Sequence, residues 1–192
     1  MKQKTKTLLI LGILAIIILV TIGTIYKMKQ TTQIKITTSD GEIILELYPG
    51  EAPITVANFL EYVESGHYEN TVFHRVMEDF MIQGGGFTQD GKEKSTKKPI
   101  KLESDNGLKN KEYTIAMART SVPDSATSQF FINTKDNDFL DYNPQNEGYA
   151  VFGKVIQGQE IINVIKNKET TNKNGMPDWP VEDILILKVE VL

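Results

Sequence analysis

The chain of 192 residues contains no cysteine, and it has only two histidines and one tryptophan. Without cysteine the protein can form no disulfide and can carry no lipid on a thiol. Zinc binding is poorly supported, because His67 and His74 would be its only histidine or cysteine ligands. The sequence also lacks a Gly-x-Ser-x-Gly motif, which argues against a serine hydrolase. We therefore expect neither a metal nor a cofactor.

A phosphate-binding loop is a further reading that the sequence does not support. Residues 86–92 have the spacing of such a loop, but the next residue is Glu93. A serine or threonine is needed at that position to hold magnesium, and an acidic side chain would repel the phosphates. We expect an ordinary loop here, and the three glycines at 84–86 favour a sharp turn or a bulge.

One long uncharged run occupies residues 7–26, and three lysines precede it. A helix of that length spans roughly 30 Å, the thickness of the hydrocarbon core of a bilayer. We predict a short cytoplasmic N-terminus at residues 1–6, a single-pass transmembrane anchor at 7–26, a linker at 27–33 and a globular domain at 34–192. The lysines before the run place that domain outside the cytoplasm. Cleavage of the run, giving a secreted form, is the alternative.

The remainder of the chain is acidic. Residues 31–192 keep 16 basic and 25 acidic residues, a net charge of −9. Nucleic acid is therefore not an expected partner, because phosphate binding requires a basic surface. The length of this part suits one domain, and we expect a monomer.

Short apolar runs and turn residues alternate through most of this domain. A hairpin is predicted at 34–38 and 43–47, and a helix at 53–65 with Val56, Phe59, Leu60 and Val63 on one stripe. Further strands are predicted at 71–76, 80–83, 113–119, 128–134, 149–155 and 181–192, and a second helix after Gly158. Many short strands with two helices indicate a mainly β fold, a barrel rather than a βαβ sheet.

Arg75 stands out, because the chain uses arginine only twice among 21 basic residues. Both Arg75 and Arg119 lie within apolar runs. A guanidinium cannot lose its proton and is weakly hydrated, which suits a fixed cation against an apolar wall. In the strand from Ser128 the faces alternate, so Phe130 can fill the barrel while Phe131 points outward. An outward Phe131 and Met81 beside two glutamines predict a groove with apolar walls and neutral polar ends.

The residue types around Arg75 restrict the chemistry. The motifs hold no nucleophile, no activated base and no pair of carboxylates. A cation, two amides and an apolar pocket can hold a peptide and stabilise a redistribution of charge. Rotation about an Xaa-Pro bond is such a reaction, because its barrier of about 18–20 kcal/mol comes from amide resonance. A donor aimed at the prolyl nitrogen stabilises the twisted amide more than the planar one.

The motifs together resemble the cyclophilin family of peptidyl-prolyl isomerases. They occur in order over nearly all of residues 33–192, and they are Phe73-His74-Arg75-Val76, Phe80-Met81-Ile82-Gln83-Gly84-Gly85, Met117-Ala118-Arg119, Ser128-Gln129-Phe130-Phe131-Ile132 and Val151-Phe152-Gly153. The resemblance implies an eight-stranded antiparallel barrel capped by two helices, with the site on its outer face. It implies prolyl isomerisation of proline-containing polypeptides, which here would be exported ones.

The resemblance also implies roles for individual residues. Arg75 is the expected catalytic cation, and Gln83 is expected to hold Arg75 and the substrate carbonyl. The expected substrate-binding residues are Phe80, Met81, Ala118, Arg119, Gln129, Phe131, Phe139, Leu140 and Tyr149. Three of these depart from the common pattern of the family, since Phe139 replaces a tryptophan, Arg119 an asparagine and Tyr149 a histidine. Without the indole N–H we expect weakened cyclosporin binding.

Blander interpretations remain for several of these residues. The groove could serve a non-catalytic module that binds proline-containing peptides as a chaperone or docking site. Arg119 could be a solvated rim residue rather than a specificity contact. His74 alternates away from Arg75 along the strand, so packing is its expected role.

Overall fold

The computed structural model describes residues 32–192. The predicted anchor at 7–26 and the N-terminal residues 1–6 lie outside this range, as does most of the predicted linker. Within residues 32–192 no helix combines the length and the apolar character that crossing a bilayer requires. The first strand begins at Thr32, inside the range 27–33 that the sequence assigns to the linker.

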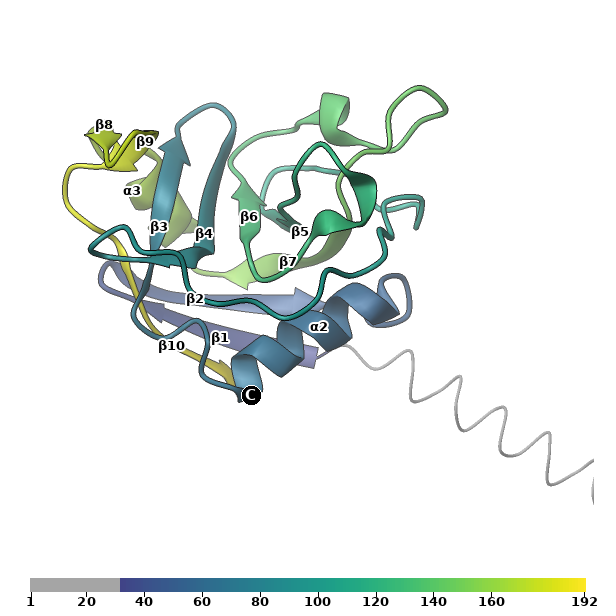
Figure 1. The fold of residues 1–192 in the computed structure, drawn as a ribbon, viewed down its shortest axis with the longest axis horizontal. Coiled ribbons are helices and arrows are strands. Elements are labelled where there is room, and N and C mark those ends of the chain that lie inside the picture. Colours follow the sequence, from purple (N-terminus) through teal and green to yellow (C-terminus); the bar gives the residue numbers. More distant parts are fainter. Residues whose placement is uncertain (1–31) are drawn as a thin grey trace, which may run out of the picture. The chain divides into compact units, whose positions relative to one another are not determined.

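The fold is a closed antiparallel barrel (Figure 1). Going around it, the strands follow the order β1-β10-β3-β4-β6-β5-β7-β2. Their bounds are β1 Thr32–Thr38, β2 Gly41–Leu47, β3 Thr71–Met77, β4 Met81–Thr88, β5 Thr114–Met117, β6 Phe130–Asn133, β7 Val151–Gln157 and β10 Leu185–Val191. The predicted eight-stranded barrel is confirmed.

The hairpin β1–β2 shows how the sequence builds the wall. Alternate residues point inward, so Ile34, Ile36, Ile43 and Leu45 are fully buried, while residues between them face outward. The turn is closed by the Thr38 hydroxyl, which donates to the carbonyl of Gly41 at 2.8 Å. The predicted hairpin is confirmed, and each of its strands begins two residues earlier than predicted.

Two α-helices close the core. Helix α2, Pro53–Glu64, begins with a proline. At that position a backbone N–H would have no acceptor within the helix, so the missing N–H of proline costs no hydrogen bond. The Glu103 carboxylate accepts from the N–H groups of Ile54 and Thr55 at that end. Helix α3, Gln159–Lys166, buries Ile162 and Ile165 in the same core. Two short 3-10 turns, η1 Pro123–Ser125 and η2 Asp138–Leu140, lie in the loops.

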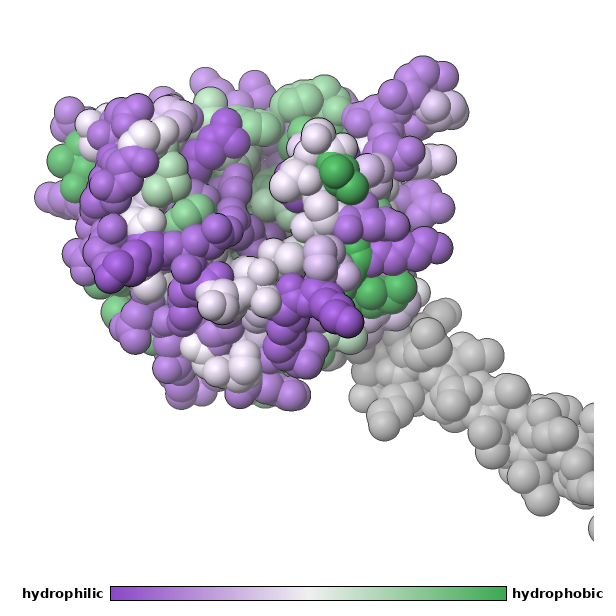
Figure 2. Space-filling model, viewed as in Figure 1, coloured by the Kyte–Doolittle hydropathy of each residue, from purple (hydrophilic) through white to green (hydrophobic). Residues whose placement is uncertain are grey.

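Aromatic rings fill the centre. The ring of Phe59 from α2 lies 5.1 Å from that of Tyr68, 5.7 Å from that of Phe130 and 5.3 Å from that of Phe152. Hydrophilic residues cover most of the face drawn in Figure 2, and the hydrophobic ones there form separate small patches. The barrel is therefore a packed support, and a binding site has to lie on its outside.

Several features differ from the sequence prediction. A second sheet, β8 Thr170–Lys173 and β9 Met176–Pro180, forms where no hairpin was predicted. The strand predicted at 181–192 is shorter, because β10 covers Leu185–Val191. The strand predicted at 80–83 is longer, because β4 covers Met81–Thr88.

Candidate active site

Four neighbouring strands place residues of the predicted site side by side. Arg75 on β3 pairs with Gln83 on β4, Gln83 pairs with Phe131 on β6, and Phe131 pairs with Ala116 on β5. Side chains at directly paired positions lie on the same face of a sheet. The strand order β3-β4-β6-β5 therefore gathers residues that are far apart in sequence on one outer face of the barrel.

Glycine allows β4 to follow β3 closely. The register between the two strands shifts twice, between Thr71 and Phe73 and between Phe73 and Arg75. Gly85 has φ +83°, and a Cβ there would lie 2.8 Å from Tyr68 and 2.9 Å from Phe130. Such bulges are typical of strands that re-aim a side chain beside a site.

A cavity of about 110 Å³ opens on this face. It is lined by Arg75, Phe80, Met81, Gln83, Ala118, Arg119, Phe131, Leu140 and Tyr149. These are the predicted site residues except Gln129 and Phe139. The side-chain oxygen of Gln129 accepts from the Gln83 amide at 2.9 Å, so Gln129 adjoins the lining through Gln83. Phe139 is 63% exposed and stacks on Phe80, with the ring centroids 5.6 Å apart.

The floor of the cavity is apolar. Met81, Phe131 and Leu140 are almost fully buried and pack together in a cluster separate from the barrel core. The Tyr149 ring meets Phe131 edge to face at 5.7 Å. Phe130 belongs to the core cluster, so the alternation predicted for this strand is confirmed. The cavity has the size and character for a small apolar side chain or ring.

The Arg75 guanidinium lies at the wall of the cavity. Its Nη2 donates to the Met77 sulfur at 3.3 Å, its Cζ lies 5.8 Å from the Phe80 ring centroid, and its Nε lies 3.6 Å from a carboxylate oxygen of Asp178. The Gln83 amide, expected to hold Arg75, donates instead to Gln129. Sequence reasoning missed Asp178, which lies in the unpredicted hairpin β8–β9.

Arg119 is fixed at the other end of the cavity. Its Nε and Nη2 both donate to the carbonyl of Gly148, at 2.9 and 2.8 Å, and Nη1 donates to the carbonyl of Thr120 at 2.9 Å. The guanidinium carbon lies 4.5 Å from the Tyr149 ring centroid. Arg119 is therefore an ordered rim cation that holds the loop before β7.

Buried amides that no sequence motif indicated support the apolar floor from behind. The Asn137 amide donates to the Phe80 carbonyl and to Asn133 Oδ1, both at 2.7 Å. The Asn110 amide donates to the Leu140 carbonyl at 3.1 Å. The backbone of two lining residues is thus tied to one network, which restricts movement of the cavity wall.

His74 follows the same strand but faces away from the cavity, as predicted. Its ring lies 4.7 Å from Phe87 and 6.0 Å from Trp179. Burial lowers the pKa of His74 to about 4, and the neighbouring Arg75 cation acts in the same direction. The imidazole is neutral at physiological pH and packs as an aromatic ring.

The site therefore offers a fixed cation, neutral amides and apolar walls, and its lining contains no carboxylate and no hydroxyl other than that of Tyr149. Within residues 32–192 no group of three or more side chains is arranged to ligate a metal ion. An arrangement of this kind defines a protein that holds an extended peptide with one apolar ring inserted, beside a positive charge.

Comparison with known proteins identifies the class. Residues 33–191 match the family model described as cyclophilin-type peptidyl-prolyl cis-trans isomerase. The chain is 54% identical over 162 residues to a peptidyl-prolyl cis-trans isomerase of Streptomyces antibioticus, covering 83% of this chain and 98% of that one. It is 49% identical over 157 residues to peptidyl-prolyl cis-trans isomerase B of Escherichia coli, covering 80% and 96%.

Solved structures agree with these sequence relationships. A cyclophilin-type isomerase of Cryptosporidium parvum superposes with a TM-score of 0.70 at 28% identity, covering 85% of this chain and 98% of that one. A second crystal structure of that protein, in the presence of the dipeptide Ala-Pro, gives 0.69 at 29% identity, with 83% and 98% covered.

The chain belongs to the cyclophilin-type peptidyl-prolyl cis-trans isomerase family. It is a peptidyl-prolyl cis-trans isomerase, close to the bacterial members.

Proposed function

We propose that this isomerase acts on exported polypeptides from the outer side of a membrane, and that Arg75 is its catalytic residue. The observation that carries the second part is the position of the Arg75 guanidinium at the wall of an apolar cavity, beside Phe80 and Phe131. The uncharged run at 7–26 and the lysines before it support the first part.

The mechanism follows from the electronic structure of the imide bond. Resonance keeps the bond planar, and twisting it returns the lone pair to the prolyl nitrogen. With the ring seated on Met81, Phe131 and Leu140, a guanidinium N–H can donate to that nitrogen only once the bond has twisted. The cation then stabilises the transition state more than either planar isomer, which is the condition for catalysis.

The residues beside the cavity would orient the rest of the peptide. The amides of Gln83 and Gln129 are joined by a hydrogen bond and stand on paired strands. The Ala118 N–H donates to the Gln129 carbonyl at 3.0 Å, so Ala118 and Arg119 follow directly beside these amides. Together these polar groups can fix the residues before proline, so that rotation affects one segment while the other is held.

Substituting Arg75 by alanine tests the catalytic role. We expect prolyl exchange on a short Xaa-Pro peptide, measured by exchange NMR, to fall by about a hundredfold or more at saturating peptide, with a modest rise in Kd. Lys154→Ala, which removes an exposed cation from β7, serves as the control and should retain the native rate. Exchange by Arg75→Ala at the native rate would contradict the role assigned to Arg75.

A non-catalytic chaperone or docking role for the same groove would appear as client binding by the native chain with prolyl exchange no faster than the spontaneous rate. The membrane location is tested separately. We expect the full chain to stay with the membrane after alkaline carbonate extraction, and the domain to be digested by protease added outside intact cells. A mature N-terminus beyond residue 26, found by mass spectrometry, would replace the anchored form with a secreted one.

A further inference from the structure

The hairpin β8–β9 lies against β3 of the barrel (Figure 1). Its Trp179 is fully buried, and the indole N–H donates to the Asp183 carboxylate at 2.7 Å. Lys173 Nζ donates to both oxygens of Asp183, at 2.8 and 2.9 Å. Burial alone would raise the pKa of Asp183, but the hydrogen bonds from Lys173 and Trp179 outweigh it and leave that pKa below its usual value.

A bulge in this hairpin directs one carboxylate toward the active site. Thr171 pairs with Trp179 and Lys173 pairs with Met176, so β9 contains one residue more than β8 between these pairs. Asp178 lies within this bulge with φ +61°, in the left-handed region. Bulges of this kind bend a strand and re-aim a side chain, and aspartate and asparagine are among the few non-glycine residues that tolerate this backbone conformation.

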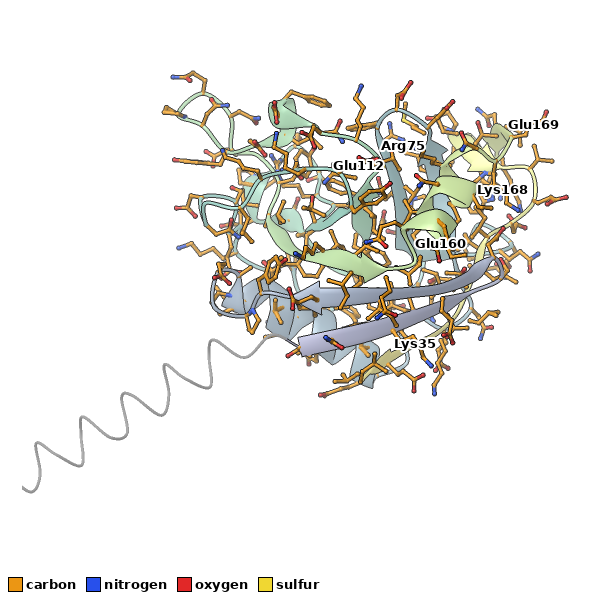
Figure 3. All side chains as sticks on the ribbon, turned by 180° about the vertical axis from the view of Figure 1, so that it is seen from behind. Lys35, Arg75, Glu112, Glu160, Lys168 and Glu169 are labelled. Carbon is orange, nitrogen blue, oxygen red and sulfur yellow. The ribbon has the colours of Figure 1, made fainter. Side chains whose placement is uncertain are left out.

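The carboxylate meets Arg75 on its outer edge. An oxygen of Asp178 lies 3.6 Å from Nε, while Nη2 donates to the Met77 sulfur. The guanidinium itself lines the proline cavity. In Figure 3, Arg75 and the residues Lys168 and Glu169 that lead into the hairpin all lie in the upper part of the view, and Lys35 lies in the lower part.

We propose that Asp178 is a positioning residue for catalysis: it holds the Nε edge of Arg75 outside the cavity and so keeps the Nη edge turned toward the prolyl nitrogen. The inference rests on the catalytic role proposed above for Arg75. A long, half-exposed arginine loses considerable rotamer freedom when it is fixed. A partner supplied by a rigid hairpin fixes it before the substrate arrives, so less of that cost falls on the transition state.

Asp178→Asn tests the proposal with little change to the backbone, since asparagine also accepts positive φ. Both side chains of the pair are partly exposed, so the effect is that of a screened ion pair. We expect kcat to fall by about three- to tenfold, with KM changed by less than about twofold. Asp178→Glu should recover part of the rate, because it retains the charge.

Glu169→Gln provides the control for charge. It removes one exposed carboxylate at the base of the same hairpin, without altering the Asp178–Arg75 pair, and should leave kcat unchanged. A spectroscopic readout separates orientation from folding. We expect the ¹⁵Nε–¹Hε resonance of Arg75 to shift and broaden in Asp178→Asn, and to remain in place in Glu169→Gln.

Two outcomes would overturn the proposal. One is a kcat for Asp178→Asn equal to or above that of the native protein. The other is a rise in KM with kcat preserved. Combining the substitutions distinguishes this failure from failure of the Arg75 role: on an Arg75→Ala background, Asp178→Asn should cause no further loss. If Arg75→Ala is itself fully active, the catalytic role of Arg75 is wrong, and the positioning role of Asp178 falls with it.

Discussion

At the scale of single residues, the function depends on where two arginines stand. The sequence showed that Arg75 and Arg119 were exceptional, and the motifs around them predicted most of the cavity lining. The structure adds what holds each one, which could not be read from the chain. The Gly148 carbonyl binds Arg119, and Asp178, more than a hundred residues from Arg75 in the sequence, pairs with it. Such partners are set by tertiary register, and no local pattern encodes them.

The pH dependence of catalysis is the first prediction at this scale. A guanidinium does not titrate in the working range, and His74, the nearest histidine in sequence, has a pKa of about 4. We expect kcat/KM to be flat between about pH 6 and pH 8. A sigmoid centred in this window, measured with a peptide that does not itself titrate there, would show that another group takes part.

Stability should depend on the protonation of His74. Its pKa is about 6.5 in the unfolded chain and about 4 in the fold, so the unfolded state binds the proton first as the pH falls. The stabilisation is complete above about pH 6.5 and is lost as the pH drops toward 4, by up to about 3 kcal/mol. We expect urea unfolding of His74→Gln to show a smaller decrease over this range. An equal decrease of the free energy of unfolding with falling pH in the native protein and in His74→Gln would contradict this prediction.

Cyclosporin binding should reflect Phe139, whose ring lies exposed on Phe80. In the family a tryptophan N–H at this position binds the drug, and phenylalanine has no such donor. We expect Phe139→Trp to tighten cyclosporin binding by about tenfold, the value of one added hydrogen bond, as measured by calorimetric titration. Phe139→Tyr, a polar ring without the indole N–H, is the control. Tight binding by the native chain would contradict the inference.

At the scale of elements, strands with clear alternation were predicted well and strands without it were not. β1 and β2 were predicted with the correct ends and with starts two residues late, because isoleucine and leucine alternate with polar residues. The hairpin β8–β9 was missed because Thr170–Lys173 has no apolar residue and Met176–Pro180 contains two prolines. Its stability comes from Trp179 and the ion pair of Lys173 with Asp183, which are tertiary contacts. β4 was predicted too short, because its glycines gave no strand signal.

The glycines of β4 yield a stability prediction. A methyl group at Gly85 would need φ +83° and would press on Tyr68 and Phe130. We expect Gly85→Ala to lower the free energy of unfolding by about 2–4 kcal/mol, from strain and overpacking together. Gly107 has the same φ with open space around it, so Gly107→Ala isolates the backbone cost, about 1 kcal/mol. Equal losses in denaturant unfolding would show that packing at Gly85 contributes nothing.

At the scale of the whole molecule, the barrel closes without the N-terminal segment. Strands β1 and β2 pair along their full length, and β10 returns to β1. We expect residues 31–192, produced alone, to fold cooperatively and to isomerise a short peptide with the kcat/KM of the full chain. Circular dichroism and exchange NMR on both forms test this. If residues 31–192 alone were misfolded or inactive, the N-terminal residues would contribute to folding or catalysis as well as to membrane location.

The central claim is that the Arg75 guanidinium acts on a proline ring seated in the apolar cavity. A crystal structure of residues 31–192 with an Xaa-Pro dipeptide measures this directly. The account predicts the ring against Phe131, Met81 and Leu140, an Nη of Arg75 within hydrogen-bonding reach of the prolyl imide, and Nε still beside Asp178. A ring bound elsewhere, or a guanidinium turned fully onto Asp178 and away from the ring, would contradict it.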